Sequence, residues 1–180
     1  MMTRVLVVIA LAAAGVSCNT PQAEPAAFTP QPHANLAQVM RGIPFTFSNI
    51  VFDAQAQDPG APRSAAEVTS SATDTFKNVY GGWQEVENSA LALAETANLL
   101  MIPGRLCENG KPVPVQEETY RKAAEGLAAA GRAAYKAAQS KSMDAIVEVS
   151  DTVATACSTC HEPYRDFDDQ SRRCTPVDTK

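Results

Sequence analysis

The sequence is poor in aromatic residues, in histidine and in basic charge. Aromatic side chains make up 6% of its 180 residues, histidine occurs twice, and 20 acidic residues outnumber 15 basic ones. Because alanine is abundant where aromatics are scarce, we expect closely packed helices rather than a β-sandwich. The net charge of −5 argues against a nucleic-acid partner, since phosphate binding requires clustered lysine and arginine. The length predicts one domain with a real core.

The sequence also lacks a hydrophobic run long enough to span a bilayer as a permanent helix. Its apolar run at residues 5–14 follows a single arginine and precedes small residues, as in a secretory signal. We therefore predict that residues 1–18 are an export signal. Cleavage either follows Ala14 or precedes Cys18, where Gly15-Val16-Ser17-Cys18 resembles a bacterial lipobox apart from glycine at the usual leucine position. The second route would make Cys18 a lipidation site and the protein's only contact with a membrane.

Residues 19–34 are rich in proline and alanine, a composition that disfavours regular structure and suits an extended tether. Behind a lipidated cysteine, this segment would hold a domain at residues 35–180 away from a membrane. Without the lipid it is simply an N-terminal tail. His33 lies at its end, and we expect it to be solvated.

Apolar residues recur at spacings of three and four in four later segments, which predicts helices. We expect them at about 35–54, 83–102, 116–139 and 142–164. Pro44 cannot donate a hydrogen bond to the carbonyl of Met40, so we expect a kink in the first helix. A short helix around residues 64–80 is an option within the long connection 57–80. No segment has a convincing strand pattern, and the prediction is an all-α, antiparallel, up-down-up-down four-helix bundle.

The predicted apolar faces follow the same spacing along each helix. The four faces consist of Leu36, Met40, Ile43, Phe47, Ile50 and Ala54; of Val86, Ala90, Leu93, Ala97 and Leu100; of Tyr120, Ala123, Leu127, Ala130, Ala134 and Ala137; and of Ile146, Val149, Val153, Cys157, Cys160 and Tyr164.

The last of these faces contains the most specific motif of the chain, Cys157-Ser158-Thr159-Cys160-His161. This is C-x-x-C-H, the attachment motif of c-type haem. The two thiols form thioethers with the haem vinyl groups, and the imidazole is placed to bind the iron from one side. On a helix all three side chains share one face, so we predict one covalent haem c in the bundle core.

Two other interpretations of the motif are weaker. A thiol redox pair is expected near a βαβ unit, which the sequence does not contain. A structural zinc site needs a second pair of ligands. The only other histidine is His33, and the remaining cysteines, Cys18, Cys107 and Cys174, form no close pair.

Together with Tyr164-Arg165, the motif resembles the C-x-x-C-H-x-x-[YF]-R ending of the class II cytochromes c, the cytochrome c prime family and its low-spin relatives. A looser likeness relates Gln38-Val39-Met40-Arg41 to the family's Arg-Gln-x-x-Met-Lys segment, and the resemblance covers roughly residues 35–168. The chain departs from the pattern in its long 57–80 connection, in Pro44 and in its additional cysteines.

The resemblance implies that His161 is the proximal iron ligand and that Met40 faces the other side of the iron. In low-spin members a methionine there is the sixth ligand, and a thioether suits haem iron, so we expect an electron carrier with His161/Met40 ligation. The alternative is a five-coordinate protein that binds nitric oxide or carbon monoxide, with Met40 as ordinary core. Arg165 is expected near the proximal face or a haem propionate, or else in solvent.

The same resemblance implies redox proteins as partners, leaves a homodimer open and predicts no enzymatic activity. A haem peroxidase would need a polar acid–base group on the distal side, and His33 is a poor candidate. Export fits the maturation of bacterial c-type cytochromes outside the cytoplasm, so we expect a periplasmic protein.

Counting the cysteines predicts a disulfide between Cys107 and Cys174. Cys157 and Cys160 are assigned to haem, Cys18 is lipidated or removed, and disulfides persist outside the cytoplasm. In an up-down-up-down bundle the second and fourth helices end at the same end of the bundle, where these two cysteines follow them. Two free thiols or an intermolecular bridge remain as alternatives. The charges of the tail, Arg165, Arg172 and Arg173 with Asp166, Asp168 and Asp169, are expected to be solvated.

Overall fold

A computed structural model of the chain describes residues 28–62 and 81–175, and within these ranges its regular structure is helical. The export signal with Cys18, most of the tether and the optional helix at residues 64–80 lie outside the described residues. The elements are α1 (Leu36–Gly42), α2 (Pro44–Asp53), α4 (Trp83–Leu100), α5 (Glu118–Gln139), α6 (Met143–Tyr164) and the short 3-10 helix η2 (Gln170–Arg172). An isolated bridge between Leu106 and Pro112 is the only strand-like pairing in the described part. The prediction of an all-helical protein is confirmed.

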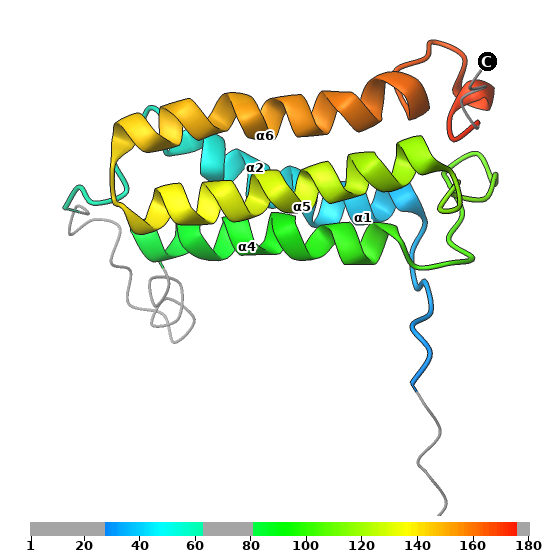
Figure 1. The fold of residues 1–180 in the computed structure, drawn as a ribbon, viewed down its shortest axis with the longest axis horizontal. Coiled ribbons are helices and arrows are strands. Elements are labelled where there is room, and N and C mark those ends of the chain that lie inside the picture. The colour runs from blue at the N-terminus through cyan, green and yellow to red at the C-terminus, as the bar shows by residue number, and fades with distance from the viewer. Residues whose placement is uncertain (1–27, 63–80, 176–180) are drawn as a thin grey trace, which may run out of the picture.

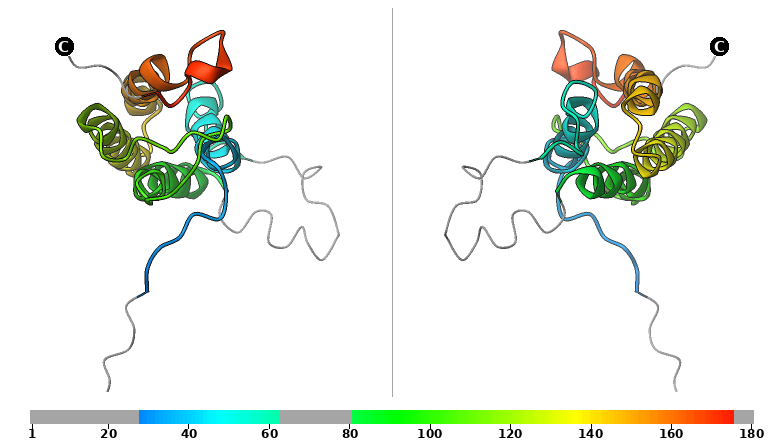
Figure 2. Two further views of the ribbon diagram at one scale, coloured as in Figure 1. Left: turned by 90° about the vertical axis from the view of Figure 1, so that its right-hand side faces the viewer. Right: turned by 90° about the vertical axis from the view of Figure 1, so that its left-hand side faces the viewer.

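The long helices lie side by side and form a bundle (Figures 1 and 2). Helix α5 packs against α4 on one side and α6 on the other, and α2 contacts both α4 and α6. α1 continues the side formed by α2. No helix among the described residues is long and apolar enough to cross a membrane.

The first predicted helix is divided into two at Ile43. Asn35 caps α1 through a capping box, in which its side chain accepts from the Gln38 amide and the Gln38 side chain accepts from the Asn35 amide. Pro44 is the first residue of α2, where a missing N–H costs nothing because that amide would have no helical partner. The sequence predicted a kink inside one helix, and the structure instead has a complete break.

The predicted core face of α4 is confirmed, because all five of its residues are buried. On α5 the predicted face is buried up to Ala134, but Ala138 is buried in place of the half-buried Ala137. Gly131 brings the two helices together: a Cβ at this position would lie 2.5 Å from the backbone nitrogen of Ala94. On α6, Ile146, Val149, Val153 and Tyr164 are buried, and the two cysteines of the motif are half-buried.

The predicted core face of the first helix packs against the core but is less buried than predicted. Of its six residues only Ala54 is buried, and the others are half-buried. The residues buried in α1 and α2 are Val39, Ser48 and Val51. The five half-buried residues still pack against core clusters, so the predicted periodicity continues across the break at Ile43.

Candidate functional site

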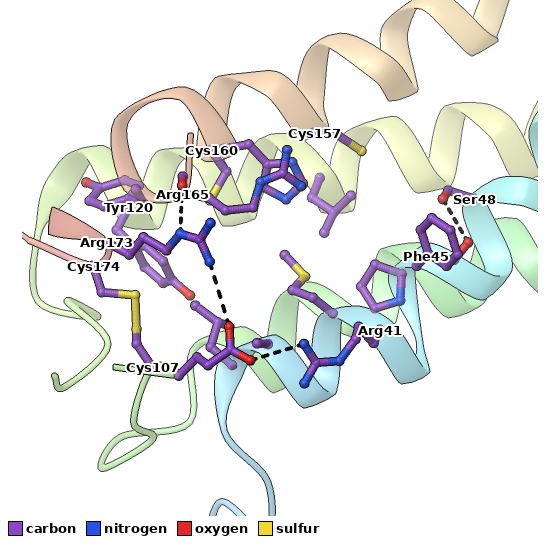
Figure 3. A pocket seen from close by; sticks show the side chains of 18 of the residues that line it. Arg41, Phe45, Ser48, Cys107, Tyr120, Cys157, Cys160, Arg165, Arg173 and Cys174 are labelled. Atoms are coloured by element: carbon purple, nitrogen blue, oxygen red, sulfur yellow. Dashed lines mark hydrogen bonds and ion pairs between the residues drawn. A yellow bond between two sulfur atoms is a disulfide. The ribbon is translucent and has the colours of Figure 1, made fainter. Parts of the chain in front are cut away.

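A pocket of about 440 Å³ opens between α6 and the α1–α2 side of the bundle (Figure 3). This volume falls within the range of roughly 300–1,000 Å³ that is typical of ligand pockets. Apolar side chains form most of its wall, with Tyr120 and Leu127 of α5 between the two sides. Three arginines and one glutamate add charged groups to this apolar lining.

Helix α6 contributes the complete C-x-x-C-H motif to this pocket. Ser142 caps the start of α6 by accepting from the Ala145 amide, and the helix continues without a break through Cys157, Cys160 and His161, all of which line the pocket. Neither thiol is bonded to another cysteine. Between the two cysteines, the hydroxyls of Ser158 and Thr159 donate hydrogen bonds to the Thr155 carbonyl of the same helix.

Partial burial sets the protonation of these three side chains. Burial raises the pKa of the Cys157 thiol and raises that of Cys160 to about 11, with a further contribution from Cys157. Burial, followed by the nearby Arg165 guanidinium, lowers the pKa of His161. The imidazole is therefore held in its neutral, metal-binding form. A reactive redox cysteine needs a lowered pKa, so these thiols do not have the character of a thiol–disulfide redox pair.

The opposite wall comes from α1 and α2. Met40 lines the pocket and is half-buried, with Leu36 and Ala37 one turn before it. Beyond the break, Phe45 and Phe52 of α2 extend the apolar surface, and Phe45 remains 66% exposed. The pocket thus has an imidazole on one helix and a thioether on another.

The predicted disulfide forms part of the same pocket. Cys107 and Cys174 are bonded, with their Cα atoms 6.5 Å apart, and both line the pocket. They pack with Tyr120 and Tyr164, whose rings meet edge to face at 5.4 Å between centroids. Of the pairings that the sequence left open, the structure has the intramolecular one.

The charged tail is not simply solvated as predicted. Arg165 is exposed and pairs with Asp166 at 2.7 Å, but its side chain also lines the pocket. Arg173 is folded back: its Nε donates to the Arg165 carbonyl at 3.1 Å, and it pairs with Glu108 at 3.7 Å. The prediction therefore holds for five of the six charges, which are exposed, and fails for Arg173, which the disulfide at the next residue and a hydrogen bond from Asn109 hold in place.

The structure brings most of the predicted site residues together around one pocket. These are Met40, Cys107, Cys157, Cys160, His161, Arg165 and Cys174. His33 is exposed and is not among the lining residues. Sequence reasoning missed Glu108, Arg173 and a second helical stripe along α1 and α2. That stripe, Arg41, Phe45, Ser48 and Phe52, has spacings of four, three and four and was visible in the sequence.

The described residues offer no cluster of three or more His, Cys, Asp or Glu side chains that could hold a metal ion by themselves. They therefore lack the ligand set of a structural zinc site in this part of the chain. Comparisons of the chain with family models, curated proteins and solved structures found no match. What the pocket can bind must be inferred from its own residues.

The residues of the pocket fit a haem. Two unpaired thiols three residues apart and the histidine that follows them face a mostly apolar cavity, and a methionine lines the wall formed by another helix. The charged side chains Arg41, Glu108, Arg165 and Arg173 also line it, which suits a flat apolar ring that carries carboxylates at one edge.

Proposed function

We propose that this protein is a c-type cytochrome that carries one covalently attached haem in the pocket and transfers electrons. The observation that carries the proposal is that the C-x-x-C-H motif of α6 and Met40 of α1 line the same apolar pocket. Cys157 and Cys160 would hold the haem through thioethers, and His161 and Met40 would be its axial ligands. The bound haem would supply an iron that changes oxidation state.

The residues around the cofactor have distinct roles in this proposal. Helix α6 fixes the spacing of the two thiols and the imidazole, so attachment and axial ligation are set by one rigid element. Burial keeps the His161 imidazole neutral and available as a ligand, since it lowers the pKa. Leu127, Phe45 and Phe52 would supply apolar surface against the bound haem. With both axial positions filled, the site needs no catalytic residue.

The proposal includes the fold and family that the sequence predicts. An antiparallel four-helix bundle of the class II cytochrome c type is supported by the contacts of α2 with α4 and α6 and of α5 with α4 and α6, if α1 and α2 count as one divided helix. Export to a periplasm, the lipid on Cys18 and redox proteins as partners are supported by the sequence alone. Outside the cytoplasm the Cys107–Cys174 disulfide would persist.

Extraction into acidified organic solvent tests the proposal. The haem of the exported protein should stay with the polypeptide, because thioethers survive this treatment. The variant Cys157→Ala with Cys160→Ala should release whatever haem it binds. If the unmodified protein also releases its haem, or contains none after expression with a c-type maturation system, the proposal is wrong.

A five-coordinate protein that binds nitric oxide or carbon monoxide is the second candidate. The observation that favours it is the partial exposure of the distal side, where Met40 is half-buried and its neighbour Phe45 is largely exposed. The absorption spectrum separates the two candidates. A low-spin ferric protein whose absorption spectrum has a weak band at ~695 nm, the general marker of methionine ligation, would support the electron carrier.

A further inference from the structure

The mouth of the pocket is positively charged although the chain as a whole is acidic. Its arginine and glutamate side chains are Arg41, Arg165, Arg173 and Glu108, so they carry a net charge of +2 in a protein whose net charge is −5. These side chains come from α1, from the loop between α4 and α5, and from the segment after α6 (Figure 3). An apolar pocket with a cationic mouth suits a ligand that is apolar over most of its surface and anionic at one edge.

Glu108 connects the two arginines that approach the mouth from opposite sides. Its Oε1 accepts from Arg41 Nη1 at 3.3 Å, and its Oε2 lies 3.7 Å from Arg173 Nη1 (Figure 3). The side chains of Arg41 and Glu108 are 64% and 45% exposed, and ion pairs this exposed contribute little to folding stability. The two ion pairs therefore position the arginine side chains without adding much to stability.

The disulfide determines where two of these charges lie. Glu108 directly follows Cys107 and Arg173 directly precedes Cys174, so the bond that joins the cysteines also holds the two charged residues across from each other. Arg173 is further fixed by its hydrogen bond to the Arg165 carbonyl, and only 30% of its side chain is exposed. Pre-organised arginines of this kind bind carboxylates with little loss of conformational freedom.

We propose that Arg41 and Arg173 bind the two propionate carboxylates of the haem and that Glu108, held by the disulfide, positions both guanidinium groups. This inference rests on the function proposed above. Arg41, Arg173 and Glu108 together carry a net charge of +1, which offsets part of the negative charge that the propionates bring. Arg165 is less suited to this role, because its Nε already pairs with Asp166 at 2.7 Å.

The midpoint potential of the purified holoprotein tests the proposal. Oxidised haem carries one more positive charge than reduced haem, so a nearby arginine disfavours oxidation. Arg41→Gln and Arg173→Gln should each shift the midpoint potential to a lower value, and Glu108→Gln should shift it to a higher one. In the resonance Raman spectrum, the propionate bending bands should move in both arginine variants because a hydrogen bond to the carboxylate is lost.

Arg172→Gln is the matched control. Arg172 is next to Arg173 and loses the same charge, but its guanidinium lies 4.5 Å from the ring centroid of Phe167 and it does not line the pocket. The midpoint potential and the propionate bands of this variant should stay at the wild-type values. Arg173→Lys keeps the positive charge but not the planar guanidinium group. Its midpoint potential should stay close to the wild-type value, while its propionate bands should move.

The outcomes separate this inference from the function on which it rests. If the wild-type protein carries no covalent haem, the proposed function and this inference both fail. If all variants carry covalent haem but Arg41→Gln and Arg173→Gln shift the potential no more than Arg172→Gln, only the propionate assignment is overturned. Shifts of the expected sign with moved propionate bands support it.

Discussion

Helix α5 packs tightly against α4, whereas α6 and the α1–α2 side of the bundle stand apart around a pocket. At the first contact the residues are fully enclosed and most of them are small: Ala90, Leu93 and Ala134 are 0% exposed, and Gly131 lies directly against the backbone of α4. At the second, Met40, Cys157 and Cys160 are half-buried. The close packing of α4 and α5 therefore gives the bundle a rigid side. The other side can then stay open without collapsing, because interiors packed this closely deform little.

If the pocket holds the proposed haem, the largest change expected on the open side is in the coordination of its iron. Met40→Ala should convert a six-coordinate, low-spin haem into a high-spin one that binds carbon monoxide readily, because it removes the only thioether among the described residues that line the pocket. The absorption spectrum of the oxidised protein and of the reduced protein with carbon monoxide would show the change. Met101→Ala, at the end of α4 and not among the lining residues, is the control. An unchanged spectrum in Met40→Ala would make Met40 an ordinary core residue.

Removal of the disulfide should lower the free energy of unfolding. Cys107 and Cys174 are 67 residues apart, and closing a loop of this length stabilises by on the order of 4 kcal/mol in the loop-entropy model, which is an upper figure. The double variant Cys107→Ser with Cys174→Ser should therefore unfold at a clearly lower urea concentration. Denaturation of the unmodified protein with and without reductant gives a second measurement. Equal midpoints under both conditions would mean that the bond is absent in solution.

At the tight contact between α4 and α5, Gly131→Ala should lower the free energy of unfolding by about 1–3 kcal/mol, since the new methyl group would push the two helices apart. Gly126 is the matched control in the same helix, because a Cβ there meets no atom within 4 Å. Gly126→Ala should stabilise the protein by about 0.5–1 kcal/mol through helix propensity. Urea denaturation of both variants tests the contrast, and two effects of the same sign would show that the contact between α4 and α5 is looser than described.

The smallest effect is expected at the rim of the open side. Phe45→Ser should change the free energy of unfolding of the haem-free protein by no more than about 0.5 kcal/mol, because the ring is already 66% exposed. Leu93→Ala, at 0% exposure, should cost about 2–5 kcal/mol. Chemical denaturation of the two variants would compare the rim with the core directly. A cost of several kcal/mol for Phe45→Ser would mean that the pocket wall belongs to the core.

The sequence predicted the parts of this structure that depend on local pattern. The periodicity of α4, α5 and α6 was sufficient to identify them to within two residues at their ends, because each buries one continuous stripe. In the first helix the spacing identified residues that pack against the core, but Pro44 begins a new helix instead of bending an old one. Within the site, the motif of α6 could be read directly from the chain.

Other parts of the site arise from contacts between distant segments. Arg41 and Glu108 are 67 residues apart, and Glu108 and Arg173 lie on two irregular segments that are joined by the disulfide and by hydrogen bonds from Asn109 to the carbonyls of Gln170 and Arg173. Loops and tails have no periodicity from which such contacts could be derived. The pairing of the cysteines was predictable because counting left two of them. The position of that bond beside the pocket was not predictable from the sequence.

The disulfide also divides the chain into a covalent ring and two free arms. The ring begins at Cys107 and ends at Cys174, so it contains α5, α6 and the C-x-x-C-H motif, while α1, α2 and α4 lie outside it. When the protein unfolds with the bond intact, the ring segment keeps its two ends together and the arms do not. A protease that cuts at the exposed Lys141 in the turn between α5 and α6 would leave two fragments still joined through sulfur. The segment that carries the motif therefore stays attached to the mouth of its own pocket even after the backbone is nicked.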